Sequence, residues 1–201
     1  MKGLRVGLTG GLACGKSFVG KTLERLGAHL IHADELGHAA LEPGGEAYEP
    51  VIREFGSEVV DTEGRIDRQR LAAMVFGNPE RLAKLNAIVH PAVYRLQEEI
   101  ERKIRATDPQ SMVVVEAAIL IETGTYKNYD RIILVTCEEA QQMERALSRG
   151  VPRTDIEARI SRQLPLATKR QFADFVIDTS GTKEDTILQT RAIYESLQNS
   201  A

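Results

Sequence analysis

The chain has 201 residues, which is enough for one sizeable hydrophobic core with an appended subdomain and too few for two large independent domains. Its 26 Lys and Arg residues against 29 Asp and Glu residues give a net charge of −3, which excludes a protein whose whole surface binds nucleic acid or an anionic membrane. No apolar run approaches the ~20 residues of a membrane-spanning helix, and the first residues lack a signal-peptide pattern. We therefore expect a soluble cytoplasmic protein.

The amino-terminal segment combines a predicted strand, a glycine-rich loop and a predicted helix. Residues 4–8 are strand-like, and GGLACGKS at residues 10–17 fits the pattern G-x-x-x-x-G-K-[ST]. Apolar residues in 18–26 then recur at helical spacing. Glycines let a backbone wrap around an anion, so that its amides point at the anion. The segment predicts a phosphate-binding loop, with a glycine-rich turn that carries a surface lysine as the alternative.

Two side chains of this loop have predicted chemical roles. Lys16 is expected to reach the β- and γ-phosphates of a nucleotide, and the Ser17 hydroxyl to ligate Mg²⁺ at the positive end of the helix. The residues predicted to bind the nucleotide are Gly11, Leu12, Ala13, Cys14, Gly15, Lys16, Ser17 and Phe18.

The chain has two cysteines, Cys14 and Cys137, which lie far apart in the sequence. A structural disulfide or a zinc site is therefore not expected. Cys14 is either a redox-sensitive thiol beside bound phosphate or a small residue that the loop tolerates.

Four further strand-like segments alternate with helical ones, at residues 27–32, 111–116, 130–136 and 173–178. This alternation predicts an α/β fold with a five-stranded parallel sheet, in which ligands lie at the carboxyl ends of the strands. Asp34 follows the second strand and Glu116 ends the third. Asp34 is predicted to accept a hydroxyl proton or to hold a metal-bound water, with a helix N-cap as its alternative role. Glu116 is predicted to orient the substrate or a metal-bound water.

Residues 36–107 form an insertion that is mostly helical. A parallel crossover needs only a dozen or so residues, so we expect about seventy to form a separate region with its own task. Asp67 is predicted to cap a helix that carries Arg68. Because proline interrupts helices, His90-Pro91 is predicted to form a corner, where His90 has a structural or a chemical role.

Seven basic side chains against two acidic ones occur between residues 145 and 170. A capping box at residues 154–157 predicts a short helix there. The segment is expected to form a helical lid over residues 149–170 that closes over polyphosphate, with Arg149 and Arg159 among its cations. A solvated basic helix is the alternative.

The ordered set of these motifs resembles the dephospho-coenzyme A kinase family over nearly the whole chain. The residues that carry the resemblance are Leu8-Thr9-Gly10-Gly11 with the loop, Ala33-Asp34, Asp67-Arg68, His90-Pro91, Glu116 with Leu120 to Glu122, Arg145 and Arg149, Gln163 to Lys169, and residues 173–178 with Ser180-Gly181. The resemblance implies a P-loop kinase that uses ATP and Mg²⁺. It also implies transfer of the γ-phosphate to the ribose 3′-hydroxyl of dephospho-coenzyme A, the final step of coenzyme A biosynthesis.

The resemblance also implies roles for regions and residues. It makes residues 1–35, 108–148 and 171–201 the nucleotide-binding core, 36–107 the dephospho-coenzyme A region and 149–170 the lid. Asp34 is implied to be the base for the acceptor hydroxyl, and Arg145 to act with Lys16 on the transferring group. The residues implied to bind dephospho-coenzyme A are Thr9, Asp34, Arg68, His90 and Glu116.

Four positions depart from the usual family pattern, namely Phe18, His32, Ala118 and Thr179. His32 argues against a two-aspartate metal arrangement, and Thr179 changes a position implied to contact adenine. None of the four removes a group that the chemistry needs.

From the residues alone, the motif order predicts a magnesium-dependent kinase of a small hydroxyl acceptor. A nucleoside or nucleotide kinase and a nucleotide-dependent switch are the alternatives. D-x-x-G at residues 61–64 is ordinary turn chemistry, and the absence of N-K-x-D weighs against a GTPase. The expected partner is the small-molecule substrate, without nucleic acid or membrane, and the expected state is a monomer or a small homo-oligomer.

Overall fold

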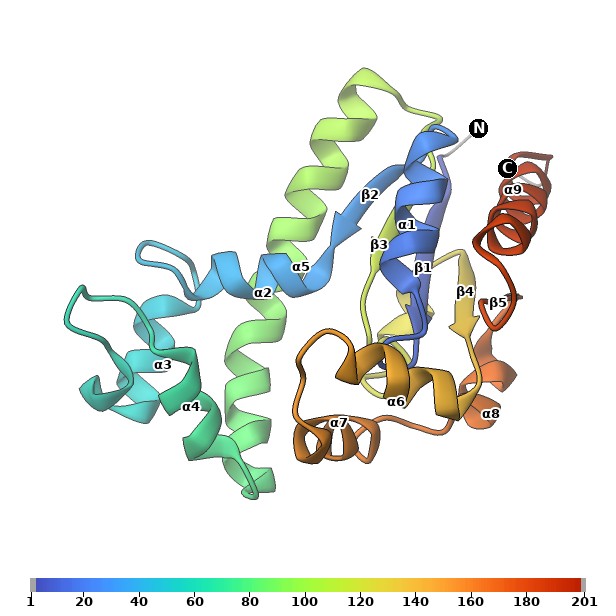
Figure 1. The fold of residues 1–201 in the computed structure, drawn as a ribbon. Coiled ribbons are helices and arrows are strands. Elements are labelled where there is room, and N and C mark those ends of the chain that lie inside the picture. The colour runs from blue at the N-terminus through green and yellow to red at the C-terminus, as the bar shows by residue number, and fades with distance from the viewer. Residues whose placement is uncertain (1–2, 200–201) are drawn as a thin grey trace. The chain divides into compact units, whose positions relative to one another are not determined.

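The computed structural model describes residues 3–199. Within them the chain forms two compact units, one comprising residues 3–32 and 104–199 and the other residues 33–103 (Figure 1). No helix in the described part of the chain is long and apolar enough to cross a membrane.

A five-stranded parallel sheet is the centre of the first unit, as the sequence predicts. Its strands are β1 (Arg5–Gly10), β2 (His29–His32), β3 (Val113–Glu116), β4 (Arg131–Thr136) and β5 (Phe175–Asp178), in the order β2-β3-β1-β4-β5. The side chains of Val6, Val114 and Ile133 are completely buried. Such uninterrupted apolar strands are typical of a parallel sheet that is covered on both faces.

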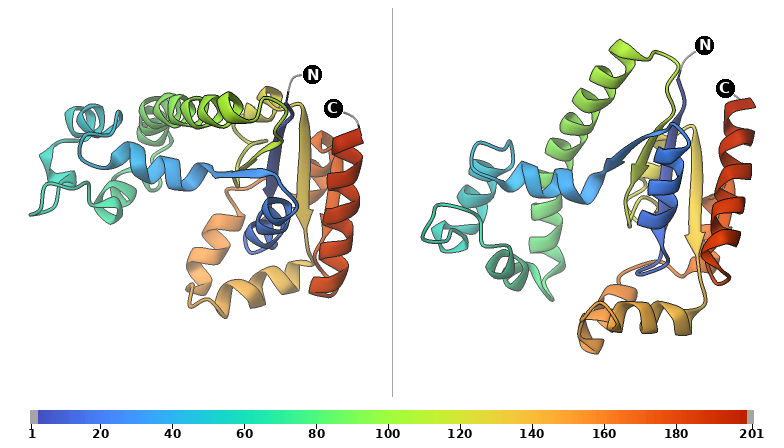
Figure 2. Two further views of the ribbon diagram at one scale, coloured as in Figure 1. Left: turned by 90° about the horizontal axis from the view of Figure 1, so that it is seen from above. Right: turned by 45° about the horizontal axis from the view of Figure 1, so that its top comes forward.

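Helices on the sheet complete this core. The α-helices that lie wholly in the first unit are α1 (Lys16–Arg25), α6 (Glu139–Leu147), α7 (Arg153–Ile160), α8 (Leu166–Lys169) and α9 (Lys183–Asn199), with short 3-10 turns η2 (Thr125–Asn128) and η3 (Arg170–Phe172). α1 contacts α9, and Figure 2 shows the two helices beside the strands. Leu23 of α1 and Leu197 of α9 are fully buried in the same core cluster as Val6.

The second unit is helical and has a core of its own. It contains α2 (Ala33–Leu41), α3 (Tyr48–Phe55), η1 (Ser57–Val59), α4 (Arg68–Val75) and most of α5 (Pro79–Thr107). Val51, Phe55 and Leu71 are among its buried core residues. Asp67 caps α4 as predicted, because its carboxylate accepts hydrogen bonds from the backbone amides of Gln69 and Arg70.

The predicted corner at His90-Pro91 is wrong. α5 is one helix of 29 residues that contains Pro91 in its interior. Proline in a helix removes one backbone hydrogen bond and costs about 3 kcal/mol or more. Ala92, the next residue, is completely buried, and Ile88 and Leu96 pack on the same core. This packing on both sides of the proline keeps the helix continuous.

The predicted capping box at residues 154–157 is also wrong. α7 begins at Arg153, and Pro152, not Thr154, occupies the N-cap position, without a side-chain hydrogen bond. The fixed φ angle of proline suits a helix start, so Pro152 immediately precedes the helix and Thr154 falls in its first turn.

Candidate active site

The loop between β1 and α1 has a backbone that few residues can adopt. Ala13 has φ 55° and Gly15 has φ 87°, both in the left-handed region. Gly11 has no room for a side chain, because a Cβ there would collide with Nε2 of Gln142 and lie 2.8 Å from Sγ of Cys14. The loop is therefore held in a tight turn just before α1 begins at Lys16.

Donors of this loop are available to an anion. Within residues 3–199 the backbone amides of Ala13, Gly15 and Ser17 donate no hydrogen bond to protein. They lie at the amino end of α1, where unsatisfied amides and the helix dipole favour negative charge. Nζ of Lys16 donates to the carbonyl oxygens of Gly11, at 2.8 Å, and Gly10, at 3.4 Å. The ammonium group thus lies against the loop, as a phosphate-binding lysine requires.

Three polar side chains meet where β1, β2 and β3 end. Oγ of Ser17 donates to Oε1 of Glu116 at 2.8 Å, and Nδ1 of His32 lies 3.1 Å from Oε2 of Glu116. His32 and Glu116 face each other in the parallel register of β2 and β3. The order of the strands therefore brings Ser17 and Glu116, predicted from different motifs, into direct contact.

This contact suits a magnesium ion. Mg²⁺ prefers oxygen ligands and is commonly held by one or two protein oxygens together with substrate phosphates and water. The Ser17 hydroxyl and the Glu116 carboxylate supply such oxygens. Within the described residues no group of three His, Cys, Asp or Glu side chains gathers as a metal site, so an all-protein cage is absent there.

Arg145 of α6 is fixed to the loop through Thr179. Its Nη1 donates to Oγ1 of Thr179 at 3.0 Å, and its Nη2 donates to the Thr179 carbonyl oxygen at 2.7 Å. Oγ1 of Thr179 in turn donates to the carbonyl oxygen of Cys14 at 2.8 Å. Thr179, an unusual residue for the resembled family at this position, therefore links the arginine to the phosphate loop.

The segment predicted to be a lid packs on the loop. Ile156 of α7 is fully buried in a small cluster with Ala13 and Ala146. Arg149 and Arg159 are exposed, and their side chains form no ion pair or hydrogen bond with other described residues. These two guanidinium groups are therefore available to a ligand.

Gln163 and Lys169 connect the end of this segment to the rest of the unit. Oε1 of Gln163 accepts a hydrogen bond from the backbone amide of Leu12 at 3.0 Å. Lys169 is completely buried, and its Nζ lies 2.8 Å from Oε1 of Glu122 and donates to the Ala118 carbonyl oxygen at 3.0 Å. Lys169 is thus an interior residue and not part of a basic surface. No sequence pattern indicates the Gln163 contact, because its partner is a backbone group.

Thr9, near the carboxyl end of β1, lies in the interior. It is completely buried, and its hydroxyl donates to the Ala118 carbonyl oxygen at 3.4 Å. The substrate contact implied for Thr9 stays a prediction.

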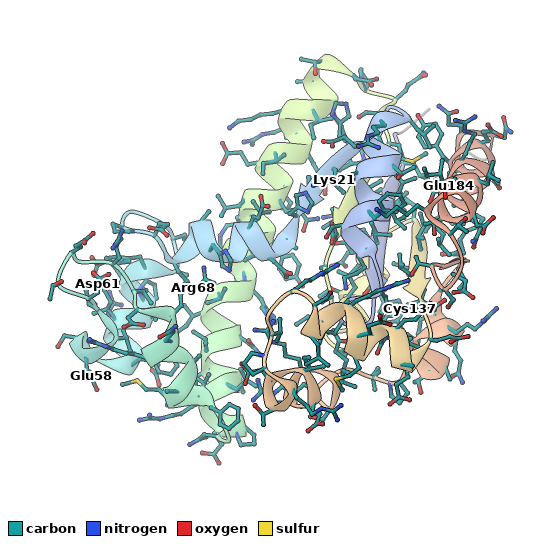
Figure 3. The ribbon with its side chains drawn as sticks, in the orientation of Figure 1. Lys21, Glu58, Asp61, Arg68, Cys137 and Glu184 are labelled. Carbon is teal, nitrogen blue, oxygen red and sulfur yellow. The ribbon has the colours of Figure 1, made fainter. Side chains whose placement is uncertain are left out.

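Asp34, Arg68 and His90 belong to the second unit. Asp34 lies exposed in the first turn of α2, two residues after the end of β2. α2 begins at Ala33, so Asp34 is not its N-cap. Arg68 is exposed at the start of α4, where Figure 3 labels it. His90 is half-buried on α5, and burial lowers the pKa of its imidazole, so the neutral form is favoured.

Comparison with known proteins places relatives along nearly the whole chain. The family model for dephospho-CoA kinase matches residues 4–185. A dephospho-CoA kinase of Aquifex aeolicus is 42% identical over 193 residues, which cover 96% of this chain and 97% of that protein. Among solved structures, TT1252 from Thermus thermophilus has a TM-score of 0.82 and 31% identity, and covers 98% of this chain and 99% of its own. A dephospho-CoA kinase from Campylobacter jejuni has a TM-score of 0.70 at 24% identity over 98% of each chain, which indicates a shared fold.

Proposed function

Since the chain belongs to the dephospho-CoA kinase family, we propose that it transfers the γ-phosphate of ATP to the ribose 3′-hydroxyl of dephospho-coenzyme A, giving coenzyme A and ADP. The observation that carries the proposal is the loop at residues 10–17, with its donor amides, the Lys16 ammonium and the Ser17–Glu116 contact. Phosphoryl transfer needs mainly positioning and charge stabilisation, and these groups supply both.

The loop holds the donor nucleotide in this proposal. The amides of Ala13, Gly15 and Ser17 bind phosphate oxygens, and Lys16 moves from the Gly11 carbonyl oxygen to the β- and γ-phosphates. Ser17 and Glu116 hold Mg²⁺, which when bound neutralises charge on the phosphates.

Asp34 and the arginines complete the proposed chemistry. The Asp34 carboxylate accepts the proton of the acceptor hydroxyl as its oxygen attacks the γ-phosphate. Arg145 carries positive charge at the end of α6 and is already oriented by Thr179. Arg149 and Arg159 add charge from the segment that packs on the loop.

The regions of the chain receive matching roles. Residues 36–107, with Arg68 and His90, bind dephospho-coenzyme A, and residues 149–170 act as the lid over the nucleotide. We further propose that the protein works in the cytoplasm as a monomer or a small homo-oligomer.

An assay with purified protein, ATP, Mg²⁺ and dephospho-coenzyme A tests the proposal. We expect ADP release together with a product that is heavier than dephospho-coenzyme A by one phosphate, and ³¹P NMR then locates that phosphate on the 3′-oxygen. A panel of nucleosides and nucleotides under the same conditions is the control. Turnover of one of these acceptors, with none for dephospho-coenzyme A, would contradict the proposed substrate.

A further inference from the structure

The two cysteines of the chain lie side by side, although 123 positions separate them in the sequence. Sγ of Cys137 is 3.4 Å from Sγ of Cys14, and both residues are buried in the core. The sheet explains this proximity, because β1 and β4 are neighbours in which Gly10 faces Val135. Cys14 follows β1 in the phosphate loop, and Cys137 follows β4, where Figure 3 labels it.

The surroundings of the two sulfur atoms give them different chemistry. The Cys137 thiol donates a hydrogen bond to Cys14, Nε2 of Gln142 donates another at 2.8 Å, and Lys16 adds positive charge. Together, and against the effect of burial, they lower the pKa of the Cys14 thiol to about 6. The bond to Cys14 and burial both raise the pKa of the Cys137 thiol. Cys14 is thus the more acidic thiol of the pair, and Cys137 is the less acidic thiol in contact with it.

We propose that Cys14 and Cys137 form a redox-sensitive pair, which hydrogen peroxide converts into a disulfide that weakens nucleotide binding. The proposal goes beyond the phosphotransfer reaction and does not depend on the acceptor. It rests on the distance between the sulfur atoms and on the place of Cys14 in the loop.

The chemistry is a two-step oxidation. The Cys14 thiolate attacks one oxygen of hydrogen peroxide, so that the O–O bond breaks, a Cys14 sulfenic acid forms and hydroxide leaves. Cys137 then loses its proton to that hydroxide, and its sulfur attacks the Cys14 sulfur. The S–S bond forms, the S–O bond breaks, and the departing oxygen leaves as water once protonated. In sum, two thiols and one peroxide give one disulfide and two waters.

A cavity brings the peroxide close to the buried sulfur. Its volume is about 480 Å³, and Gly11, Gln142 and Gln163 are among the residues that line it. Gln142 is also the residue whose amide donates to Sγ of Cys14. The side chain of Gln142 therefore both lines the cavity and contacts the Cys14 sulfur.

Disulfide formation has to distort the phosphate loop. A disulfide has an S–S distance of about 2.05 Å, so one or both sulfur atoms must move. Cys14 lies between Ala13 and Gly15, both in left-handed conformations, and its carbonyl oxygen accepts the hydrogen bond from Thr179 that links Arg145 to the loop. A shift of Cys14 therefore displaces amides that are proposed to bind phosphate.

Peptide mapping and ATP titration together test the proposal. The native protein is treated with hydrogen peroxide, the excess is removed, and a non-reducing digest is analysed by mass. We expect a linked peptide pair that contains Cys14 and Cys137. We also expect ATP affinity to fall by roughly tenfold or more and to return after treatment with dithiothreitol.

Two substitutions at Cys137 serve as matched controls. Reduced Cys137→Ala and Cys137→Ser proteins are expected to bind ATP with native affinity within roughly twofold, because Cys137 does not belong to the proposed binding loop. After peroxide they should lack the reversible loss of affinity, since no second thiol is present to close the disulfide.

Three results would overturn the proposal. The first is the absence of a linked Cys14–Cys137 peptide in the oxidised native protein. The second is an unchanged ATP affinity when that peptide is present. The third is a reversible loss of ATP affinity in the Cys137 variants that equals the loss in the native protein. The mapping uses the native protein, so a variant that fails to fold leaves the test intact. Neither readout uses dephospho-coenzyme A, so a wrong acceptor assignment appears only in the turnover assay.

Discussion

The Lys16 ammonium adds charge to a loop whose shape the backbone already sets. The left-handed angles at Ala13 and Gly15 hold the turn, whereas Lys16 contacts carbonyl oxygens of the loop through a flexible side chain. We therefore expect Lys16→Ala to lower kcat/KM by roughly 100-fold or more while the circular dichroism spectrum stays native. Lys21→Ala, on the exposed side of the same helix, is the matched control and should stay within roughly twofold of native. Near-native activity of Lys16→Ala would refute the role of the loop.

Asp34 is proposed to accept a proton, so its loss should appear in turnover. Asp34→Asn keeps the size of the side chain and removes its basicity. We expect kcat to fall by roughly 10²–10⁴-fold with little change in ATP affinity, measured by steady-state kinetics and a binding titration. Glu35→Gln changes the next exposed carboxylate of α2 and should leave kcat near native. A collapse of ATP affinity in Asp34→Asn would instead make Asp34 a metal ligand or a structural residue.

The sequence predicted the chemical groups of the site better than their contacts. Lys16, Ser17 and Glu116 were predicted as site residues because they follow or end apolar strands, and a parallel sheet collects ligand groups at one edge. The links from Arg145 to Thr179 and from Gln163 to Leu12 depend on which backbone groups come near. No sequence pattern specifies such backbone partners, so these contacts required the structure.

At the scale of elements, α9 offers a direct measurement of capping. Oγ1 of Thr182 accepts a hydrogen bond from the backbone amide of Asp185 at 3.0 Å, and Oδ2 of Asp185 accepts one from the backbone amide of Thr182 at 3.1 Å. We expect Thr182→Ala to lower the free energy of unfolding by about 1 kcal/mol in urea titrations. Glu184→Ala, in the same turn, is the matched control and should have a smaller effect. Equal losses would show that the cap does not stabilise α9.

Because the Asp185 carboxylate takes part in this cap, the stabilisation of α9 depends on pH. Hydrogen bonds from the Thr182 side chain and backbone lower the pKa of Asp185 below its ordinary value of 3.8. The charged carboxylate is therefore favoured in the folded state, and its stabilisation is complete above the ordinary pKa. It is lost as the pH falls through the lowered value. Urea titrations of native and Asp185→Asn proteins should differ at pH 6 and converge in strong acid. A difference that persists at acidic pH would contradict this account.

The elements also show where sequence patterns fail. The five strands were predicted because apolar runs of this kind mark buried parallel strands, but their order in the sheet was not. The order places β4 next to β1, and that adjacency brings Cys137 to Cys14. Likewise, a local rule for proline predicted a corner at Pro91, whereas burial of Ala92 and its neighbours keeps α5 continuous.

At the scale of the whole molecule, each of the two units has a large hydrophobic core within the described residues. The length of the insertion after β2 predicted a separate region, and residues 33–103 do form a compact unit with buried Val51 and Leu71. The other unit has its core around the sheet, with Val6 and Ile133. Because each unit has its own apolar interior, we expect each to unfold and refold locally without unfolding of the other.

This organisation predicts that ATP stabilises one unit selectively. Ligand at 100 times its dissociation constant stabilises the state that binds it by about 2.7 kcal/mol. The phosphate loop belongs to the sheet unit, so ATP should slow amide hydrogen exchange there, for example in β1 and β4, by up to roughly 100-fold. Exchange in α3 and α4 should change little until dephospho-coenzyme A is added. Equal slowing of both units by ATP alone would mean that they open as one cooperative structure, because a ligand then protects every amide that exchanges through the shared opening.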